Sequence, residues 1–246
     1  MMLARTIMAF GLTILTVIIF TPLGLVSFIV SLLGLKRPMS WIMYKIAQGW
    51  GRCVIFATGC TLEVEGRENV PKSGGVCFVS NHVGYFDIVL LLAFTGRPFG
   101  FIAKKELLLL PFINMWIFLL GGLFIDRKSL RGAINTLKRG IERIQSGEGI
   151  LIFPEGTRSK DRGLLPFKSG AIKLATNSLA PIVPIAITGS YDVFEKNKLV
   201  NAAHVRLIFC PPIITAEMSA EDRRSNLTDQ IHSTIGEALT KNETAL

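Results

Sequence analysis

An uncharged run of 30 residues near the N-terminus is the feature that most constrains how this chain folds. It lies between Arg5 and Lys36 and is mostly apolar. About 20 such residues are enough to cross a bilayer as a helix. Pro22 and Gly24 interrupt the run near its middle, and both residue types disfavour helix interiors. The run is therefore predicted to form either one kinked membrane span or a shallow re-entrant helix pair.

Residues 40–58 have the pattern of a second, amphipathic helix. Its broad apolar face is formed by Trp41, Ile42, Met43, Ile46, Ala47, Trp50, Val54 and Ile55, and its polar stripe by Lys45, Gln48, Gly49 and Arg52. Basic helices that carry Trp suit an anionic membrane surface, and a core helix is the alternative. Residues 1–62 hold five basic and no acidic side chains. We therefore predict a membrane-anchoring part at residues 1–60 on the cytoplasmic face of a membrane.

From residue 61 onward, short β-branched runs alternate with helical patterns. The predicted strands are 61–65, 76–80, 99–103, 123–126, 149–153, 182–188 and 205–209. The segment 129–146 is predicted to be a helix whose apolar face consists of Leu130, Ala133, Ile134, Leu137, Ile141 and Ile144. A last helix is predicted from a Ser219–Asp222 cap, with an apolar stripe of Leu227, Ile231, Ile235 and Leu239. This alternation predicts that residues 61–246 form one α/β domain, with a mixed central sheet flanked by helices.

A second uncharged run, at residues 107–125, is 19 residues long. Pro111 and the Gly121-Gly122 pair interrupt it. We predict two or three buried or membrane-facing elements there rather than a span.

The composition narrows the function further. The net charge is +9 although half of the residues are hydrophobic, which excludes a disordered chain. The basic excess accompanies apolar runs of bilayer length, so the expected partner is a phospholipid bilayer and not nucleic acid. Four Cys without a CxxC pair, together with three His, argue against a metal site and predict buried, reduced thiols.

The loop after the predicted strand 76–80 carries a His82–Asp87 pair. Gly84 permits a tight bend between the two, which would bring the carboxylate to one imidazole nitrogen and leave the other free. Such a pair can act as a general base. A loop histidine beside a helix-terminal acid is the alternative. No GxSxG elbow surrounds Ser80, and Cys77 is expected to pack in the strand, so we prefer direct action of His82 on a substrate hydroxyl.

A polar turn follows the predicted strand 149–153. In it, Gly156 allows close backbone approach to a ligand. Arg158 can donate two parallel hydrogen bonds to a phosphate, and the hydroxyl groups of Thr157 and Ser159 can donate further ones. Glu155 is expected to orient Arg158 or to bind a substrate hydroxyl. The alternative is an ordinary turn that contains an ion pair.

Basic side chains follow several predicted strands. They are Lys104, Lys105, Arg127, Lys128, Arg158 and Lys160. Ligands of α/β folds gather outside the carboxyl ends of strands, so these residues predict an anion site, with phosphate as the natural candidate. A solvated basic rim that touches anionic lipid is the alternative, and both readings can hold together.

The pattern resembles a known family. Residues 81–87 resemble the NHxxxxD motif of the glycerolipid acyltransferases, residues 122–127 the second block of that family, residues 153–159 (FPEGTRS) its third, and residues 183–187 its Val-Pro strand. Within the family, the chain looks most like the 1-acylglycerol-3-phosphate acyltransferases of the bacterial PlsC type.

The resemblance implies a reaction and a set of roles. His82 would be the general base that deprotonates the sn-2 hydroxyl of lysophosphatidic acid, and Asp87 its partner. The hydroxyl would attack the thioester of acyl-CoA or acyl-carrier protein without an acyl-enzyme and without a further cofactor, giving phosphatidic acid. The substrate would be bound by Asn81, Lys105, Arg127, Glu155, Gly156, Thr157 and Arg158. A different lysolipid acceptor, or lipid binding without turnover, remains the alternative.

Overall fold

The computed structural model describes residues 1–34, 36–160 and 162–240. Its strands are β1 (Thr61–Glu65), β2 (Val76–Ser80), β3 (Phe99–Lys104), β4 (Leu123–Ile125), β5 (Gly149–Ile152), β6 (Ile182–Thr188) and β7 (His204–Phe209). Its helices are α1 (Met2–Leu32), α2 (Lys36–Thr58), α3 (Phe86–Phe94), α4 (Ile113–Leu119), α5 (Leu130–Gln145), α6 (Ser169–Ser178), α7 (Ser190–Phe194), α8 (Ala220–Ser225) and α9 (Leu227–Thr240), with 3-10 turns η1 (Arg67–Asn69), η2 (Lys105–Leu109) and η3 (Thr215–Glu217). Every predicted strand is found, within one residue at each end.

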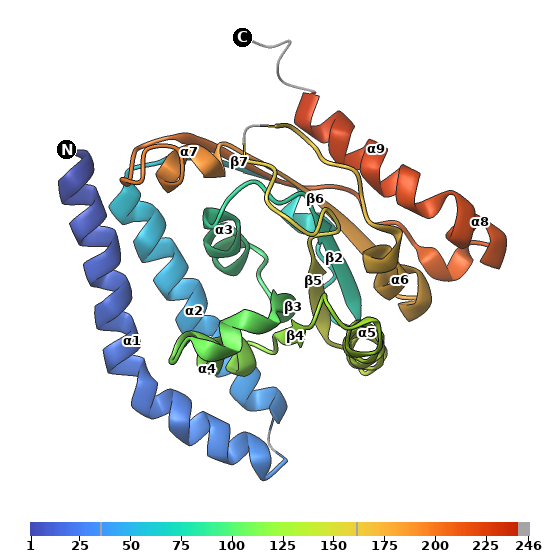
Figure 1. Ribbon diagram of the computed structural model, residues 1–246, viewed down its shortest axis with the longest axis horizontal. Coiled ribbons are helices and arrows are strands. Elements are labelled where there is room, and N and C mark those ends of the chain that lie inside the picture. The colour runs from blue at the N-terminus through green and yellow to red at the C-terminus, as the bar shows by residue number, and fades with distance from the viewer. Residues whose placement is uncertain (35, 161, 241–246) are drawn as a thin grey trace.

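The strands form one sheet in the order β1-β7-β6-β2-β5-β3-β4. All neighbouring strands are parallel except β6 and β7, which are antiparallel. The predicted mixed sheet is therefore confirmed. Helices cover both of its faces, as Figure 1 shows.

The alternation of side chains along β2 builds two cores. Val76 and Phe78 face the layer of α2 and α3, whereas Cys77 and Val79 face α5, α6 and α9. Both faces of the central strands are thus buried, which explains why these strands read as continuous apolar runs. The carboxyl ends of the parallel strands are left free to carry a site.

The N-terminal run forms one continuous helix, α1, that contains Pro22. Figure 1 shows α1 changing direction partway along its length and lying beside α2. Pro22 has no backbone N–H, so one intrahelical bond is missing there. Residues Met2–Val30 are long and apolar enough to cross a membrane by length and composition, and only 11% of the window is buried. Most of this apolar surface is therefore uncovered by the protein.

The predicted polar stripe of α2 is exposed at Lys45, Gly49 and Arg52. Gln48 departs from it, because it is buried and donates to the carbonyl oxygen of Ala93 in α3. Met43, Tyr44 and Ala47 are also buried, which corresponds to the core-helix alternative for this segment. The division of the chain at residue 60 stays a prediction.

Three further predictions need correction. The buried face of α5 differs from the predicted apolar face. Leu130 and Ile134 are exposed, whereas Thr136 and Gly140 are buried. The last helix is broken at Asn226, although Ser219 caps α8 as predicted by accepting from the Asp222 amide. Cys77 and Cys210 are buried free thiols, but Cys53 is exposed. Residues 107–125 do form separate elements, as expected.

Candidate active site

Three loops meet at one edge of the sheet. β2, β5 and β3 are parallel neighbours, so their carboxyl ends point the same way. His82 follows β2, the FPEGTRS turn follows β5, and Lys105 follows β3. The sheet therefore gathers three sequence blocks that lie up to about 75 residues apart in the chain.

Asp87 holds the imidazole of His82 by one carboxylate oxygen. Its Oδ2 lies 2.7 Å from Nδ1 of His82 and accepts the amides of Val83 at 2.7 Å and Gly84 at 3.1 Å. The other oxygen, Oδ1, accepts the hydroxyl of Ser190. Asp87 is fully buried, so these donors replace its water shell.

This geometry decides which nitrogen of His82 is free. A carboxylate can only accept, so Nδ1 carries the proton and Nε2 is left as the base. The Phe153 ring stacks on the imidazole with 4.0 Å between ring centroids. The His82 side chain keeps 21% exposure. The spacing correctly predicted the pairing of His82 with Asp87, and the catalytic role of the pair stays a prediction.

Glu155 lies against the backbone of the same loop. Its Oε1 accepts the His82 amide at 2.8 Å. Its Oε2 is buried and has no hydrogen-bond partner among the described residues. Burial raises the pKa of Glu155 to about 7, although the bond from the His82 amide acts in the opposite direction. Glu155 thus braces the His82 loop and does not orient Arg158, which corrects that part of the expectation.

Arg158 has a partner that the sequence did not suggest. Its guanidinium pairs with Glu195 and lies 3.7 Å above the centre of the Tyr85 ring. Glu195 is buried and also accepts the Tyr85 amide at 2.5 Å. A planar guanidinium held in this way on two sides is fixed in direction. Arg158 keeps its side chain 27% exposed, so part of it still faces solvent.

Asn81 is placed differently from the prediction. It was expected to bind substrate, but its side chain is buried and both amide atoms bond to the backbone of Ile187, at 2.9 and 2.8 Å. The side chain of Asn81 therefore ties the end of β2 to β6. That role sets the position of His82 and leaves no amide group directed at a ligand.

The second block lies beside the third. Arg127 donates to the carbonyl oxygen of Gly156, and Lys105 pairs with Asp126 at 2.9 Å. Gly156 has a φ of 69°, which is the left-handed conformation that glycine adopts most easily. Thr157 is exposed beside it. The structure thus brings Lys105, Arg127, Gly156 and Thr157 to one basic rim. The His82 loop lies against the same turn, because the His82 amide donates to Glu155 and the Ser159 amide donates to the carbonyl oxygen of His82.

Two residues at the ends of α7 were not predicted from the sequence. Ser190, the first residue of α7, bonds to Asp87, and Glu195, the residue that follows α7, bonds to Arg158. Each lies more than 30 residues along the chain from its partner. The only available signal was a pair of polar residues close behind a buried strand.

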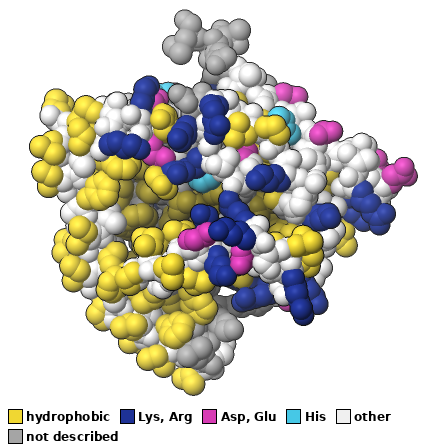
Figure 2. Space-filling model, in the orientation of Figure 1, with side chains coloured by type: hydrophobic (Ala, Val, Ile, Leu, Met, Phe, Trp, Pro, Cys, Tyr) yellow, Lys and Arg dark blue, Asp and Glu magenta, His cyan; other side chains and the backbone are white. Residues whose placement is uncertain are grey.

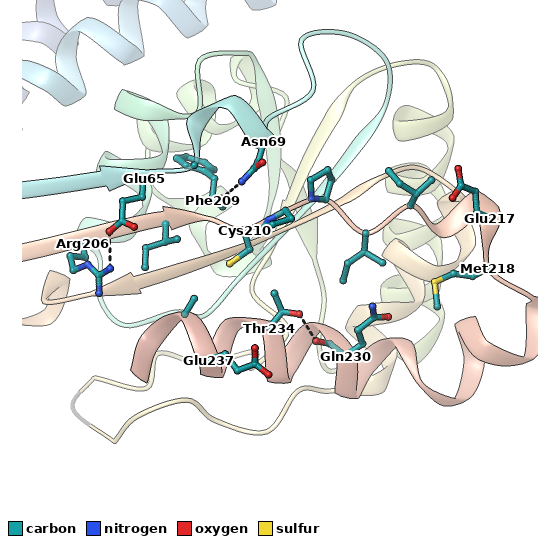
Figure 3. Close-up of a pocket in the computed structure, with 17 residues that line it drawn as sticks. Glu65, Asn69, Arg206, Phe209, Cys210, Glu217, Met218, Gln230, Thr234 and Glu237 are labelled. Carbon is teal, nitrogen blue, oxygen red and sulfur yellow. Dashed lines mark hydrogen bonds and ion pairs between the residues drawn. The ribbon is translucent and has the colours of Figure 1, made fainter. Parts of the chain in front are cut away.

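A groove of about 900 Å³ lies away from this site, between β7 and α9, as Figure 3 shows. Glu65, Glu217 and Glu237 line it, and its only basic side chain, Arg206, pairs with Glu65. An acidic groove of this kind does not suit a phosphate. It contains none of the predicted site residues.

A His–Asp pair beside a basic rim, at the carboxyl edge of an α/β sheet, defines a class: an enzyme that can activate a hydroxyl next to an anionic group. Comparison with known proteins then gives the family. Residues 61–188 match the family model described as Acyltransferase.

Relatives agree with this match. The 1-acyl-sn-glycerol-3-phosphate acyltransferase of Borreliella burgdorferi is 32% identical over 74% of this chain and 72% of its own length. A chloroplastic protein of that name from Brassica napus is 32% identical over 76% of this chain and 55% of its own length. The crystal structure of the 1-acyl-sn-glycerophosphate acyltransferase PlsC from Thermotoga maritima is 25% identical, with a TM-score of 0.81 over 97% of this chain and 95% of that one. This chain belongs to the acyltransferase family and is an O-acyltransferase.

Proposed function

We propose that this protein transfers an acyl group from an acyl thioester to the sn-2 hydroxyl of 1-acylglycerol-3-phosphate, giving phosphatidic acid. The observation that carries the proposal is the buried Asp87 holding His82 beside the basic rim. The relatives' activity as 1-acyl-sn-glycerol-3-phosphate acyltransferases supports the same acceptor.

In the proposed mechanism, Nε2 of His82 takes the proton of the acceptor hydroxyl. The hydroxyl oxygen attacks the thioester carbonyl carbon and forms a new C–O bond. The C–S bond then breaks, and the departing sulfur receives the proton back from His82. Asp87 stabilises the imidazolium between these two steps. No residue becomes acylated, and the only small molecules required are the two substrates.

The acceptor phosphate is proposed to bind at the basic rim. Arg127 and Lys105 are exposed there, and Arg158 is held in place by Glu195. Guanidinium groups suit phosphate oxygens because they donate two parallel hydrogen bonds. Gly156 and Thr157 contribute backbone and hydroxyl donors. The donor is proposed to be acyl-CoA or acyl-carrier protein.

Membrane association is proposed to come from α1, whose apolar surface is largely uncovered. A lysophospholipid acceptor resides in a bilayer, so an anchored enzyme meets it without extracting it into water. The basic N-terminal quarter supports a position at the cytoplasmic face, which in a bacterium is that of the inner membrane.

An acceptor panel tests the proposal. Purified protein would be given one acyl thioester with 1-acylglycerol-3-phosphate, with 1-acylglycerol, or with lysophosphatidylglycerol. We expect ester formation with the first acceptor and at least about tenfold less with the second, which lacks the phosphate. Preference for lysophosphatidylglycerol would reassign the acceptor, and lipid binding without any ester would contradict the reaction. An acylated protein in the absence of acceptor would contradict the direct mechanism.

A further inference from the structure

The chain that leaves β3 exposes large hydrophobic side chains. Residues 105–113, here called the apolar loop, comprise η2 and the turn into α4. Five of its large side chains are exposed, with Leu109 82% exposed: Leu108, Leu109, Leu110, Phe112 and Ile113. Single exposed leucines are ordinary, but a contiguous apolar group on a surface marks a contact site.

Local hydrogen bonds hold the apolar loop in this shape. Phe112 has a φ of 65°, a conformation that is costly for a residue with a large side chain. The side-chain amide of Asn114 donates to the carbonyl oxygen of Leu108 at 2.8 Å, and the amide of Leu110 donates to that of Leu107. Strained conformations persist where surrounding bonds enforce them, and they gather at functional positions.

Basic side chains surround the base of the apolar loop. Residues 104–131 contain five basic and two acidic side chains. The basic ones are Lys104, Lys105, Arg127, Lys128 and Arg131, and all are exposed. Figure 2 shows Lys and Arg gathered over the middle of the molecule, directly beside hydrophobic side chains. An apolar tip with a basic rim complements an anionic lipid surface, with its acyl chains below charged headgroups.

The apolar loop continues into the uncovered surface of α1. Phe118 of α4 packs edge-on against Phe28 of α1, with 5.2 Å between ring centroids. A Cβ placed on Gly24 would lie 3.1 Å from the Met115 side chain, so the two helices approach closely there. Helix α4 therefore joins the two apolar surfaces.

We propose that the apolar loop is a second membrane contact, which inserts into the leaflet of an anionic bilayer independently of α1. The proposal rests on the membrane-bound lysolipid chemistry proposed above. The loop is connected to the candidate active site. Lys105 at its base pairs with Asp126, and the next residue, Arg127, donates to the carbonyl oxygen of Gly156 in the FPEGTRS turn. Insertion thus places the basic rim at headgroup depth, where the acceptor phosphate lies.

The same rim is compatible in charge with an acidic acyl-carrier protein. A docking site for a polar, acidic protein would need basic side chains but not an exposed tip of leucine and phenylalanine. The apolar character of residues 108–113 therefore favours lipid.

A depth measurement tests the proposal directly. Leu109→Trp would be made in full-length protein that also carries His82→Ala, so the result does not depend on acyl transfer. It would be bound to vesicles of phosphatidylcholine and phosphatidylglycerol, with and without bromine on the acyl chains. Subtracting the emission of the same protein without the added Trp isolates the reporter. We expect bromine to quench the added emission by about half or more.

Ile214→Trp is the matched control, because Ile214 is an exposed aliphatic residue in the segment between β7 and η3. Its emission should be unaffected by bromine. Equal, weak quenching at positions 109 and 214 would overturn the proposal. The proposal would also be overturned if the emission of the Trp at position 109 changed on adding acyl-carrier protein without vesicles and was not quenched by brominated lipid. That result would assign the rim to protein docking.

A second variant pair gives a functional measure. Leu109→Glu combined with Phe112→Glu should lower acyl transfer to vesicle-borne acceptor by about fivefold or more and transfer to a water-soluble, short-chain acceptor by less than about twofold. Equal loss with both acceptors would contradict membrane insertion. Absence of activity in wild-type protein would count against the proposed function only, because the depth measurement stands without it.

Discussion

At the scale of single residues, the distinctive feature is that both oxygens of Asp87 are occupied. His82, two backbone amides and Ser190 all bond to this buried carboxylate. A carboxylate held by several donors keeps its direction. The free nitrogen of His82 is therefore aimed by a network that reaches into α7.

Ser190→Ala tests the reach of that network. Removing the hydroxyl takes one hydrogen-bond donor from the buried carboxylate, so Asp87 should hold the imidazole less firmly. The kcat/KM should fall roughly fivefold to twentyfold. Ser178→Ala is the control, because it removes a buried hydroxyl that bonds to the carbonyl oxygen of Ala175 and the amide of Ala180 and has no contact with Asp87. An unchanged kcat/KM in Ser190→Ala would remove Ser190 from the network.

Glu155 gives a prediction about stability. Its pKa is raised to about 7 in the folded protein, against 4.5 as its ordinary value, so the folded state binds the extra proton between these limits. The stabilisation is complete below about pH 4.5 and is lost as the pH rises through about 7, for a total of up to about 3 kcal/mol.

Thermal unfolding in detergent across pH 4–8 measures this effect. The wild type should lose stability over that range relative to Glu155→Gln, which has no proton to release. Parallel pH curves for the two proteins would show that Glu155 is ionised in the folded state.

The sequence predicted only part of this site, because of distance along the chain. Asp87 lies five positions after His82, so one bend was enough to predict their pairing. Ser190 and Glu195 reach their partners only through the packing of β6 beside β2. Asn81 has the residue type of a ligand-binding group, but its bonds to Ile187 depend on the same strand pairing.

At the scale of elements, the turn between β6 and α7 determines whether Ser190 and Glu195 reach the site. Gly189 has a φ of 76°, and a Cβ there would lie 2.0 Å from the carbonyl oxygen of His204. That oxygen belongs to the backbone of β7 and cannot rotate away.

Gly189→Ala should therefore destabilise the fold by at least about 2 kcal/mol and reduce activity in the fraction that stays folded. Gly170→Ala is the control, since Gly170 lies in α6 with open space around it. Its melting temperature should stay the same or rise slightly. A wild-type melting temperature and rate for Gly189→Ala would show that the turn tolerates a side chain.

Strands were predicted better than helix faces, for a physical reason. A strand buried on both sides is a short apolar run whose limits are visible in the sequence. The face of a helix depends on its neighbours. Thr136 is buried because its hydroxyl reaches the carbonyl oxygen of Phe124, and Gly140 because Leu174 fills the space beside it. Neither contact is visible in the periodicity of α5.

At the scale of the whole molecule, the net charge of +9 and the large apolar share overlap in residues 1–62, which hold five basic and no acidic side chains beside the apolar α1, and both recur around the apolar loop. The apolar excess lies on α1 and the apolar loop, and basic residues gather near the carboxyl edge of the sheet. The sequence predicted this combination but not its arrangement, because α1 and α4 meet only in three dimensions.

The central claim is that His82, held by Asp87, activates the acceptor hydroxyl. The most direct measurement is the initial rate of phosphatidic acid formation from 1-acylglycerol-3-phosphate and an acyl thioester. It would compare wild type, His82→Ala and Asp87→Asn, each confirmed to be folded by circular dichroism. We predict rates about 10²- to 10⁴-fold below wild type for His82→Ala, and a loss of about 10²-fold or more for Asp87→Asn. A His82→Ala rate within about tenfold of wild type would contradict the account.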